Sequence, residues 1–281
     1  MPELPEVEII RRDLDKEVVG RKIRFAEVRS TRNAMRVIRH HGRRKEFEDR
    51  LTGARIEGVS RRGKYLMIEL SGGNVLLVHL GMSGQLLLVK ATAEFENHTH
   101  VSLRLTGSVD LRYVDPRAFG ALFVVGRDEL PGLKEFHKLG LDPLDQPLTW
   151  RYFSETLVQR RAKMKSLLMD QRFICGIGNI YSDEILFVSG LRHDRLSDTL
   201  SDQEVRRLYR AIQEVLQEAI RERGTSADDE QYRDLFGVVG GYQKLLRVYQ
   251  REGAACRRCR TPIQRARWSN RSTFFCPQCQ V

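Results

Sequence analysis

Four of the five cysteines have the spacing of metal ligands. Cys256 and Cys259 are separated by two residues, as are Cys276 and Cys279, and sixteen residues lie between the pairs. This spacing is typical of a four-thiolate zinc ribbon, in which two short turns each supply two thiolates to a tetrahedral ion. A pair of disulfides is the less favoured use of the same cysteines in a reducing cytosol. The fifth, Cys175, lies in an apolar stretch and is expected to be a small buried side chain rather than a nucleophile. The sequence therefore predicts one structural Zn²⁺.

The chain opens Met-Pro-Glu-Leu-Pro-Glu, and its second residue is either part of a frayed terminus or a reactive amine. Apolar residues then recur at helical spacing until Gly20, at Val7, Ile10, Leu14 and Val18. Pro5 suits the first turn of that helix, where its missing N–H is not needed. Pro2 and Glu3 are thus expected just ahead of an anchored helix, with Glu6 in its first turn.

The positive charge of the chain is concentrated near its C-terminal end. The formal net charge is +11, and residues 241–281 carry nine basic side chains against Glu252 alone. A local excess of that size favours a polyanionic partner, of which nucleic acid is the commonest, and a membrane surface is the weaker alternative. No run of about 18 uncharged apolar residues occurs. We expect a cytosolic protein without a membrane partner.

The hydrophobic pattern divides the chain into a strand-rich and a helical part. Between residues 21 and 125 short alternating strands indicate a β-sandwich or barrel, with a hairpin formed by 65–70 and 75–80. Residues 127–148 contain three prolines and are predicted to be a linker. Beyond Trp150 the pattern is helical, with a capping box at Ser201 and Glu204. A glycine-rich turn at 176–181 joins two helical segments there.

Several motifs together resemble the formamidopyrimidine-DNA glycosylase/endonuclease VIII family, and the opening hexapeptide resembles its formamidopyrimidine branch. They are the N-terminal Pro-Glu, Arg-Gly-Lys-Tyr-Leu at 62–66, His-Leu-Gly-Met-Ser-Gly at 79–84, Asp-Pro-Arg at 115–117, Phe-Gly at 119–120, Gly-Ile-Gly-Asn-Ile-Tyr at 176–181, and the sequence from Arg271 to Cys276. The resemblance covers nearly the whole chain. It implies an α+β multidomain fold and DNA bound in the cleft between two lobes. The domains would be a catalytic β-sandwich with its leading helix (1–126), the linker (127–148), a helix-two-turn-helix domain with a lesion-capping loop (149–245) and the zinc finger (246–281).

The resemblance implies that Pro2 is the nucleophile, once Met1 is removed. The α-amine of residue 2 would have a reference pKa of about 8, so that an appreciable fraction is unprotonated at neutral pH. Attack of this secondary amine on C1′ of a damaged nucleoside gives an iminium, which is the electron sink for β- and then δ-elimination. Glu3 would protonate the deoxyribose ring oxygen as general acid.

The family match also assigns roles to Glu6, Lys64 and Arg271. Glu6 supports the elimination steps in the family, although an acid in a first helical turn is equally expected for structural reasons. Lys64, expected on a strand, matches a phosphate contact beside the lesion with a part in elimination, the alternative being an ordinary polar strand position. Arg271 and Asn179 match the pair that clamps the phosphates flanking the lesion.

Two further residues are possible phosphate contacts. Lys165 would add one, and His98 resembles another, although a structural histidine is equally consistent with its position on the same predicted strand face as His100. Arg258 and Arg260 are expected to be either contacts or solvated charges.

Met82, Arg117 and Phe119 resemble the residues that fill the gap left by a flipped nucleotide, with the arginine facing the orphaned base. Met82 is expected in a hairpin turn, and Phe119 has a core position as its alternative. Ala118 departs from members that carry a second arginine. Residues 224–243 match the lesion-capping loop only at their Gly-Thr start, which leaves preference for 8-oxoguanine over formamidopyrimidines open.

The function implied is a base-excision-repair enzyme of the bacterial cytosol or nucleoid, acting as a monomer on damaged double-stranded DNA. It would be a bifunctional glycosylase and AP lyase for oxidised purines. The alternative is a DNA-damage-binding zinc protein without catalysis, against which the intact Pro2, Glu3 and Lys64 argue. A tautomerase with an N-terminal proline base is a second rival, but a small acidic substrate needs neither a zinc ribbon nor a basic tail.

Overall fold

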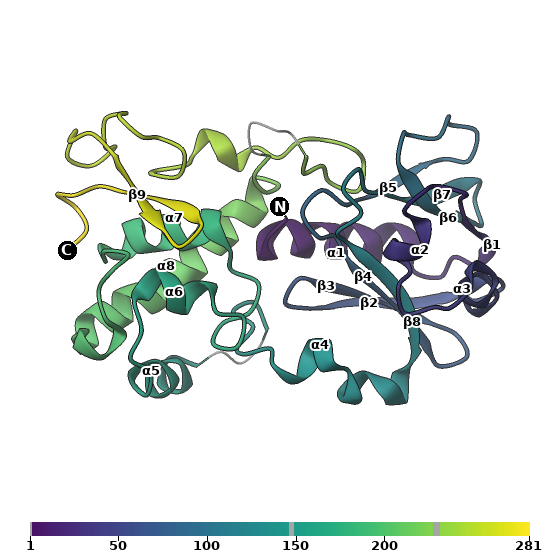
Figure 1. The fold of residues 1–281 in the computed structure, drawn as a ribbon, viewed down its shortest axis with the longest axis horizontal. Coiled ribbons are helices and arrows are strands. Elements are labelled where there is room, and N and C mark those ends of the chain that lie inside the picture. Colours follow the sequence, from purple (N-terminus) through teal and green to yellow (C-terminus); the bar gives the residue numbers. More distant parts are fainter. Residues whose placement is uncertain (1, 146–148, 227–230) are drawn as a thin grey trace. The chain divides into compact units, whose positions relative to one another are not determined.

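The computed structural model describes residues 2–145, 149–226 and 231–281, and these divide into two compact units (Figure 1). The first unit comprises the chain up to His137 together with Glu222–Gln243, and the second comprises Lys138–Arg221 and Lys244–Val281. The prediction placed residues 222–243 in the helix-two-turn-helix domain, whereas this division groups Glu222–Gln243 with the strand-rich unit.

The first unit contains two four-stranded antiparallel sheets. One sheet has the order β1-β6-β7-β5 and the other β2-β3-β4-β8. The strands are β1 (Ile23–Val28), β2 (Ile56–Arg62), β3 (Tyr65–Leu70), β4 (Asn74–His79), β5 (Gln85–Lys90), β6 (Thr99–Leu105), β7 (Val109–Val114) and β8 (Ala121–Gly126). The predicted hairpin is confirmed, since β3 and β4 pair antiparallel with Leu66 opposite Val78. The expected β-sandwich lobe is therefore present.

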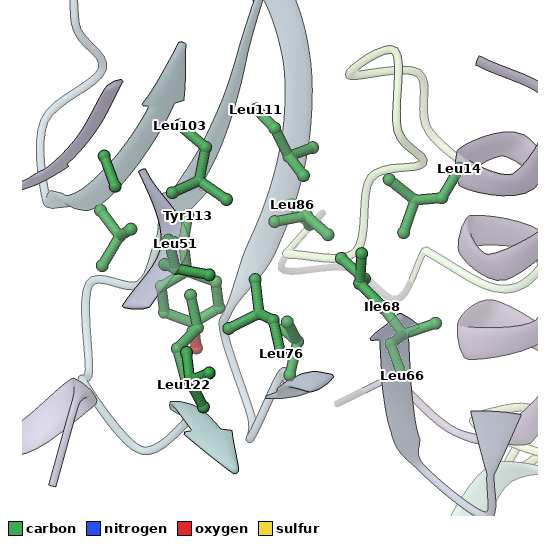
Figure 2. Packing of buried hydrophobic residues seen from close by; sticks show 14 of the residues in the cluster. Leu14, Leu51, Leu66, Ile68, Leu76, Leu86, Leu103, Leu111, Tyr113 and Leu122 are labelled. Atoms are coloured by element: carbon green, nitrogen blue, oxygen red, sulfur yellow. The ribbon is translucent and has the colours of Figure 1, made fainter. Parts of the chain in front are cut away.

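The two sheets and the leading helix share one core. In β3 the buried residues Leu66, Ile68 and Leu70 alternate with half-exposed ones, as a strand with one face on the core requires. Figure 2 shows Leu86 and Leu111 of one sheet and Leu76 of the other in this core. Helix α1 (Leu4–Val18) contributes its predicted apolar stripe, Val7, Ile10, Leu14 and Val18, to the same cluster.

Short helices complete the first unit. They are α2 (Ala34–Val37), α3 (Arg44–Leu51), η1 (Arg127–Gly132) and α4 (Lys134–His137). The last two occupy the first half of the predicted linker, and their apolar residues Leu130, Leu133 and Phe136 pack against Phe123. Partial burial of these side chains makes this stretch part of the unit rather than a free connection, and Pro131 is accommodated within the 3-10 turn.

The segment Glu222–Gln243 runs along the edge strand β5. The backbone N–H of Leu88 donates to the carbonyl of Leu235 at 2.8 Å, and the Leu235 side chain is buried in the core. Tyr232 is buried in the same cluster. These contacts cover an otherwise unpaired strand edge, which explains why this segment groups with the sheets. The acidic residues 228–230, noted in the sequence as a departure from the family, lie outside the described residues.

The second unit is helical and ends in a β-hairpin. Its elements are α5 (Trp150–Val158), α6 (Met164–Met169), α7 (Asn179–Ser189), η2 (Ser197–Thr199), α8 (Asp202–Arg221), β9 (Gln264–Trp268) and β10 (Arg271–Phe275). A further 3-10 turn, η3 (Tyr242–Lys244), lies between α8 and β9, where the segment Glu222–Gln243 ends. The capping box is confirmed, because the Ser201 N–H donates to Glu204 Oε2 at 2.8 Å. Helix α8 ends at Arg221, before Gly224.

Candidate active site

The N-terminus is held in place by the first turn of α1. Pro2 and Glu3 are both buried, and Glu3 is the N-cap residue of the helix. Its backbone N–H donates to Glu6 Oε2 at 2.8 Å, which satisfies a donor that the helix leaves unpaired. The residue preceding the helix is therefore fixed rather than frayed.

Glu6 also connects the N-terminus to the segment Glu222–Gln243. Its Oε1 accepts the backbone N–H of Thr225 at 2.8 Å. Gly224 lies so close that an added Cβ would stand 2.9 Å from Glu6 Oε1 and 2.9 Å from Tyr232 Cε1. Glu6 thus has a structural role, whatever its part in chemistry.

Lys64 lies in the turn between β2 and β3, so its predicted place on a strand was wrong. Arg62 pairs with Tyr65, which leaves Gly63 and Lys64 as a two-residue loop. Gly63 has φ +55°, and a hairpin loop of this kind prefers glycine at its first position. The turn brings Lys64 to the end of the hairpin, where a lysine can project beyond the sheet.

The Lys64 turn is tied to α1 through Arg61 and Glu8. Arg61 Nε donates to Glu8 Oε2 at 3.1 Å and Arg61 Nη1 donates to the Gly63 carbonyl at 3.0 Å. Burial acts to raise the pKa of Glu8, but hydrogen bonds from Arg11, Arg12 and Arg61 outweigh it and lower the pKa to about 2. The ionised carboxylate therefore fixes the turn that carries Lys64 relative to the helix that begins after Pro2.

His79 is a neutral neighbour of Lys64 to which the sequence analysis gave no role. Burial, together with the positive charges of Lys64 and Arg39, lowers its pKa to about 4. Its Nδ1 accepts the Gly81 N–H at 3.2 Å, and its ring lies 4.7 Å from the Tyr65 ring. His79 begins the motif at 79–84, but the sequence gave no sign of its proximity to Lys64, because that proximity comes from the pairing of β3 with β4.

The three residues predicted to fill the gap are all on the surface of the first unit. Phe119 is 41% exposed, which excludes the core alternative, and Met82 is 37% exposed. The guanidinium carbons of Arg117 and Arg36 lie 4.9 and 5.1 Å from the centre of the Phe119 ring. The Met82 turn joins β4 to β5, which belong to different sheets, so it is a connection between sheets and not the predicted hairpin turn.

His98 and His100 do not share a strand face, contrary to expectation. His98 is exposed in the turn before β6 and has φ +66°, whereas His100 is a buried residue of that strand. His100 is bonded through Nδ1 to Thr31 Oγ1 at 2.6 Å and through Nε2 to the carbonyl of Asp115 at 2.9 Å. Only His98 is therefore placed to contact a ligand.

In the second unit Asn179 lies beside the hairpin that carries Arg271. Asn179 begins α7 after the glycine turn, and its Nδ2 donates to the carbonyl of Ser272 at 3.1 Å. Arg271 is exposed at the start of β10. The structure therefore brings together two elements that are 92 residues apart in the sequence, as the clamp hypothesis requires.

Lys165 is fully buried, so a direct phosphate contact is not what this structure shows. Its Nζ donates to Asp183 Oδ1 at 2.7 Å and to the carbonyl of Asn179 at 3.0 Å. Asp183 in turn accepts the Thr273 hydroxyl at 2.5 Å and the Phe274 N–H at 3.0 Å. The pair of Lys165 and Asp183 thus fixes Asn179 and the β10 strand. The signal available in the sequence was the acidic pair Asp183-Glu184 within an otherwise apolar helix.

Arg258 packs on α7 instead of standing free. Its guanidinium lies 4.4 Å from the Phe187 ring centre and donates to the Phe187 carbonyl at 3.0 Å. Arg260 is exposed and has φ +68°.

The four cysteines predicted to bind zinc form one cluster. All four Sγ atoms lie within 4.8 Å of one another. The distances of 3.9 Å between Cys256 and Cys279 and 3.4 Å between Cys259 and Cys276 exceed a disulfide bond of about 2.05 Å, which excludes the disulfide alternative. Four soft thiolates at this spacing are the donor set of a structural Zn²⁺. Cys175 is buried, with its Sγ 3.6 Å from Asp142 Oδ2, as expected for a packed side chain.

Three family models match the chain. They are the formamidopyrimidine-DNA glycosylase N-terminal domain at residues 1–122, the formamidopyrimidine-DNA glycosylase H2TH domain at 139–230, and the zinc finger found in FPG and IleRS at 253–281. Among the described residues, no helix has the length and apolar character needed to cross a membrane.

Relatives match over the full length. A formamidopyrimidine-DNA glycosylase of Pelotomaculum thermopropionicum is 42% identical over 100% of this chain and 99% of its own. The structure of Lactococcus lactis Fpg in complex with DNA containing an abasic site is 33% identical and covers 99% of both chains, with a TM-score of 0.89. MutM (FPG) of Thermus thermophilus is 39% identical over 99% of this chain and 98% of its own, with a TM-score of 0.86. The chain therefore belongs to the formamidopyrimidine-DNA glycosylase family of DNA-repair enzymes.

Proposed function

We propose that the protein removes oxidised purines, formamidopyrimidines and 8-oxoguanine, from double-stranded DNA and then cleaves the strand as an AP lyase. The observation that carries this proposal is the bond between Glu3 and Glu6, which holds Pro2 at the start of a buried helix. A residue that only ends the chain would need no such anchoring. Support for DNA as the substrate comes from the Lactococcus lactis relative that was solved with an abasic site. We expect the protein to act as a monomer.

The reaction begins on the amine that Pro2 exposes once Met1 is removed. Its lone pair attacks C1′ of the damaged nucleoside, and the bond from C1′ to the base breaks, with its electron pair leaving on the base. The attacking nitrogen then loses its proton, which restores its lone pair, and the departing base takes up a proton. The positive end of the α1 dipole favours the neutral form of a nearby amine, which is the nucleophilic form. The position of Pro2 before the first helical turn therefore assists the attack.

Opening of the sugar ring then produces the iminium. The bond between C1′ and O4′ breaks, O4′ takes a proton from the carboxyl of Glu3, and the nitrogen lone pair forms the double bond to C1′. Glu3 is 2% exposed and directly follows Pro2 in the chain. The hydrogen bond from the Glu3 N–H to Glu6 holds the backbone of Glu3, and thereby Pro2, in a constant position during these steps.

Elimination follows because the iminium withdraws electrons from the sugar. Loss of a C2′ proton expels the 3′ phosphate, and a second elimination expels the 5′ phosphate. The ammonium of Lys64, on its turn beside neutral His79, would bind one of these phosphates and stabilise the departing charge. The Arg61–Glu8 ion pair keeps this turn in a constant position relative to α1.

The remaining predicted residues bind and distort the DNA. Asn179 and Arg271 would hold the flanking phosphates. Lys165 would act indirectly, by positioning Asn179 through its hydrogen bond to the Asn179 carbonyl. Arg117, Met82 and Phe119 would enter the space left by the flipped nucleotide, with His98 on the backbone nearby. Insertion into the DNA helix needs an exposed side chain, and the Phe119 ring is exposed with the Arg117 guanidinium beside it.

Borohydride trapping on a duplex with 8-oxoguanine opposite cytosine tests the proposal. The mature protein should form a covalent complex, and a form that retains Met1 should not, because its secondary amine is blocked. Trapping on an abasic site but not on 8-oxoguanine would restrict the proposal to other purine lesions. Absence of trapping on either substrate would favour the alternative of a DNA-damage-binding protein.

A further inference from the structure

A single buried carboxylate, that of Asp115, accepts hydrogen bonds from four donors. Oδ1 accepts the Ser83 hydroxyl at 2.6 Å and the Arg117 N–H at 3.2 Å. Oδ2 accepts the Tyr113 hydroxyl at 3.1 Å and the Gly120 N–H at 2.9 Å. Asp115 is 0% exposed, and two carboxylate oxygens have lone pairs for these four donors. Each oxygen therefore joins one hydroxyl to one backbone N–H.

These donors come from two separate surface turns. Ser83 follows Met82 in the connection from β4 to β5, whereas Arg117 and Gly120 bracket the turn that presents Phe119. The turns are also in direct contact, because a Cβ added at Gly81 would stand 2.5 Å from the Gly120 nitrogen. The Tyr113 hydroxyl is packed against both, since an added Cβ would lie 1.7 Å from it at Gly120 and 2.4 Å from it at Gly84. Neither turn can shift without the other.

A third loop is attached to the backbone of Asp115. Its N–H donates to the carbonyl of His98 at 3.1 Å, and its own carbonyl accepts from His100 Nε2 at 2.9 Å. The loop before β6, which presents the His98 side chain, is thus bonded to the residue that holds the other two. Met82, Arg117, Phe119 and His98 are therefore all on turns that are bonded to Asp115.

We propose that Asp115 is a positioning residue that makes Met82, Arg117, Phe119 and His98 one rigid element, so that they enter the DNA helix together. This inference rests on the proposed function. Unstacking a base costs a few kcal/mol, and the cost is recovered only if the wedge residues fill the gap at the same moment. Within the described residues no lysine or arginine forms an ion pair with Asp115, so the carboxylate is buried at a cost. A group that can accept all four hydrogen bonds at once explains why a carboxylate stands there.

The variant Asp115→Asn tests this because it replaces a single carboxylate oxygen with an NH₂ group. An amide offers one oxygen and one NH₂ group, so in either orientation an N–H faces the backbone N–H of Arg117 or of Gly120. The hydroxyls of Ser83 and Tyr113 can rotate, but the backbone donors cannot. One of the two turns must therefore move. A displacement of about 1 Å can cost about 100-fold in rate, and we expect excision of a damaged base from duplex DNA to fall by about that factor.

A single-stranded abasic oligonucleotide separates positioning from chemistry. It has no partner base and no gap to fill, so Asp115→Asn should be trapped on it at the rate of the unaltered protein. If the unaltered protein is not trapped on either substrate, the proposed function fails. If it is trapped and Asp115→Asn loses duplex and single-strand activity equally, Asp115 is not a positioning residue for the wedge.

Asp110→Asn is the matched control for lost stability. Asp110 is also fully buried, but it pairs with Arg104 and Arg112 on the strands and touches neither turn. The Asp110→Asn variant should have a lower melting temperature than the unaltered protein but the same ratio of duplex to single-strand activity. A 2-aminopurine opposite a tetrahydrofuran site should report wedge insertion in Asp110→Asn and a reduced signal in Asp115→Asn.

Coupling to the wedge residues gives a second, independent check. In a Met82→Ala/Phe119→Ala background two of the three wedge side chains are already removed, so Asp115→Asn should add less than about a threefold further loss in duplex excision. An additive loss of the full factor in that background would overturn the proposal.

Discussion

Glu6 and Thr225 are joined by a hydrogen bond of 2.8 Å, from the Thr225 N–H to Glu6 Oε1, across 219 residues of sequence. The other oxygen of the same carboxylate holds the Glu3 N–H. One side chain therefore connects the residue after the proposed nucleophile to the start of the segment Glu222–Gln243. A second tie runs from Arg223 to Asp13 at 2.6 Å, so the segment is fastened to α1 at two separate points. A change in the position of this segment should therefore displace Glu6, and with it the backbone at Glu3 and Pro2.

Gly224→Ala should disturb the N-terminus, whereas Gly237→Ala should not. Both glycines have positive φ, +81° and +78°, so both substitutions carry a backbone strain of about 1 kcal/mol. Only at Gly224 would the new Cβ meet Glu6 Oε1 and Tyr232, at 2.9 Å, since Gly237 has open space around it. We expect the trapping rate to fall at least about tenfold for Gly224→Ala alone, the factor that about 1.4 kcal/mol of transition-state stabilisation represents. Equal trapping rates in the two variants would show that the segment does not act through Glu6.

The stability of the first unit should depend on pH through Glu8. Its pKa is lowered from 4.5 to about 2, so its ionised form contributes stability above the unfolded pKa and loses it as pH falls toward 2. A shift of that size corresponds to at most about 3 kcal/mol. Urea unfolding should show Glu8→Gln less stable than the unaltered protein from about pH 5 to 7, with the gap closing between about pH 4.5 and 2. A gap that stays constant down to about pH 3 would contradict the ion-pair account.

Lys165 and Arg271 should differ in the salt dependence of DNA binding. Arg271 is exposed, and if it contacts a phosphate then Arg271→Ala should reduce the slope of log K against log salt by about 0.9. Lys165→Met should weaken binding and destabilise the second unit by about 3–5 kcal/mol, because Asp183 is left unpaired, yet keep the slope. A reduced slope for a folded Lys165→Met would restore Lys165 as a direct phosphate contact.

Zinc removal should affect the second unit alone. Cys256 and Cys276 pack in a small cluster with Phe187, Val248 and Phe274, so loss of the ion should loosen the hairpin on α7. Cys276→Ser or a chelator should remove zinc and weaken DNA binding, while circular dichroism retains the strand signal of the first unit. Cys175→Ala is the thiol control and should keep its zinc. Complete unfolding on chelation would show that the ribbon is not separable.

The features predicted correctly from the sequence were those set by local pattern. The apolar stripe of α1, the hairpin of β3 and β4, the capping box at Ser201 and the cysteine spacing all depend on residues close in sequence. Backbone geometry and ligand chemistry restrict such patterns to few structures, so each could be recognised without knowing the fold.

The features missed depend on contacts between distant elements. The burial of Lys165 requires Asp183, 18 residues away, and Thr273, 108 residues away. His98 is separated from His100 because His98 has a left-handed backbone conformation, and its carbonyl accepts a hydrogen bond from the Asp115 N–H. A charged or aromatic residue has the same appearance in sequence whether it is exposed or paired in a core, and only the tertiary structure distinguishes the two.

The identity of the nucleophile is the central claim, and peptide mapping of the borohydride-reduced complex tests it most directly. Two amines compete for this role, the α-nitrogen of Pro2 and Nζ of Lys64. Our account predicts that mass spectrometry finds the reduced sugar on the N-terminal peptide, at Pro2, with Lys64 unmodified. A sugar adduct on the peptide that contains Lys64, or on any other lysine, would contradict it.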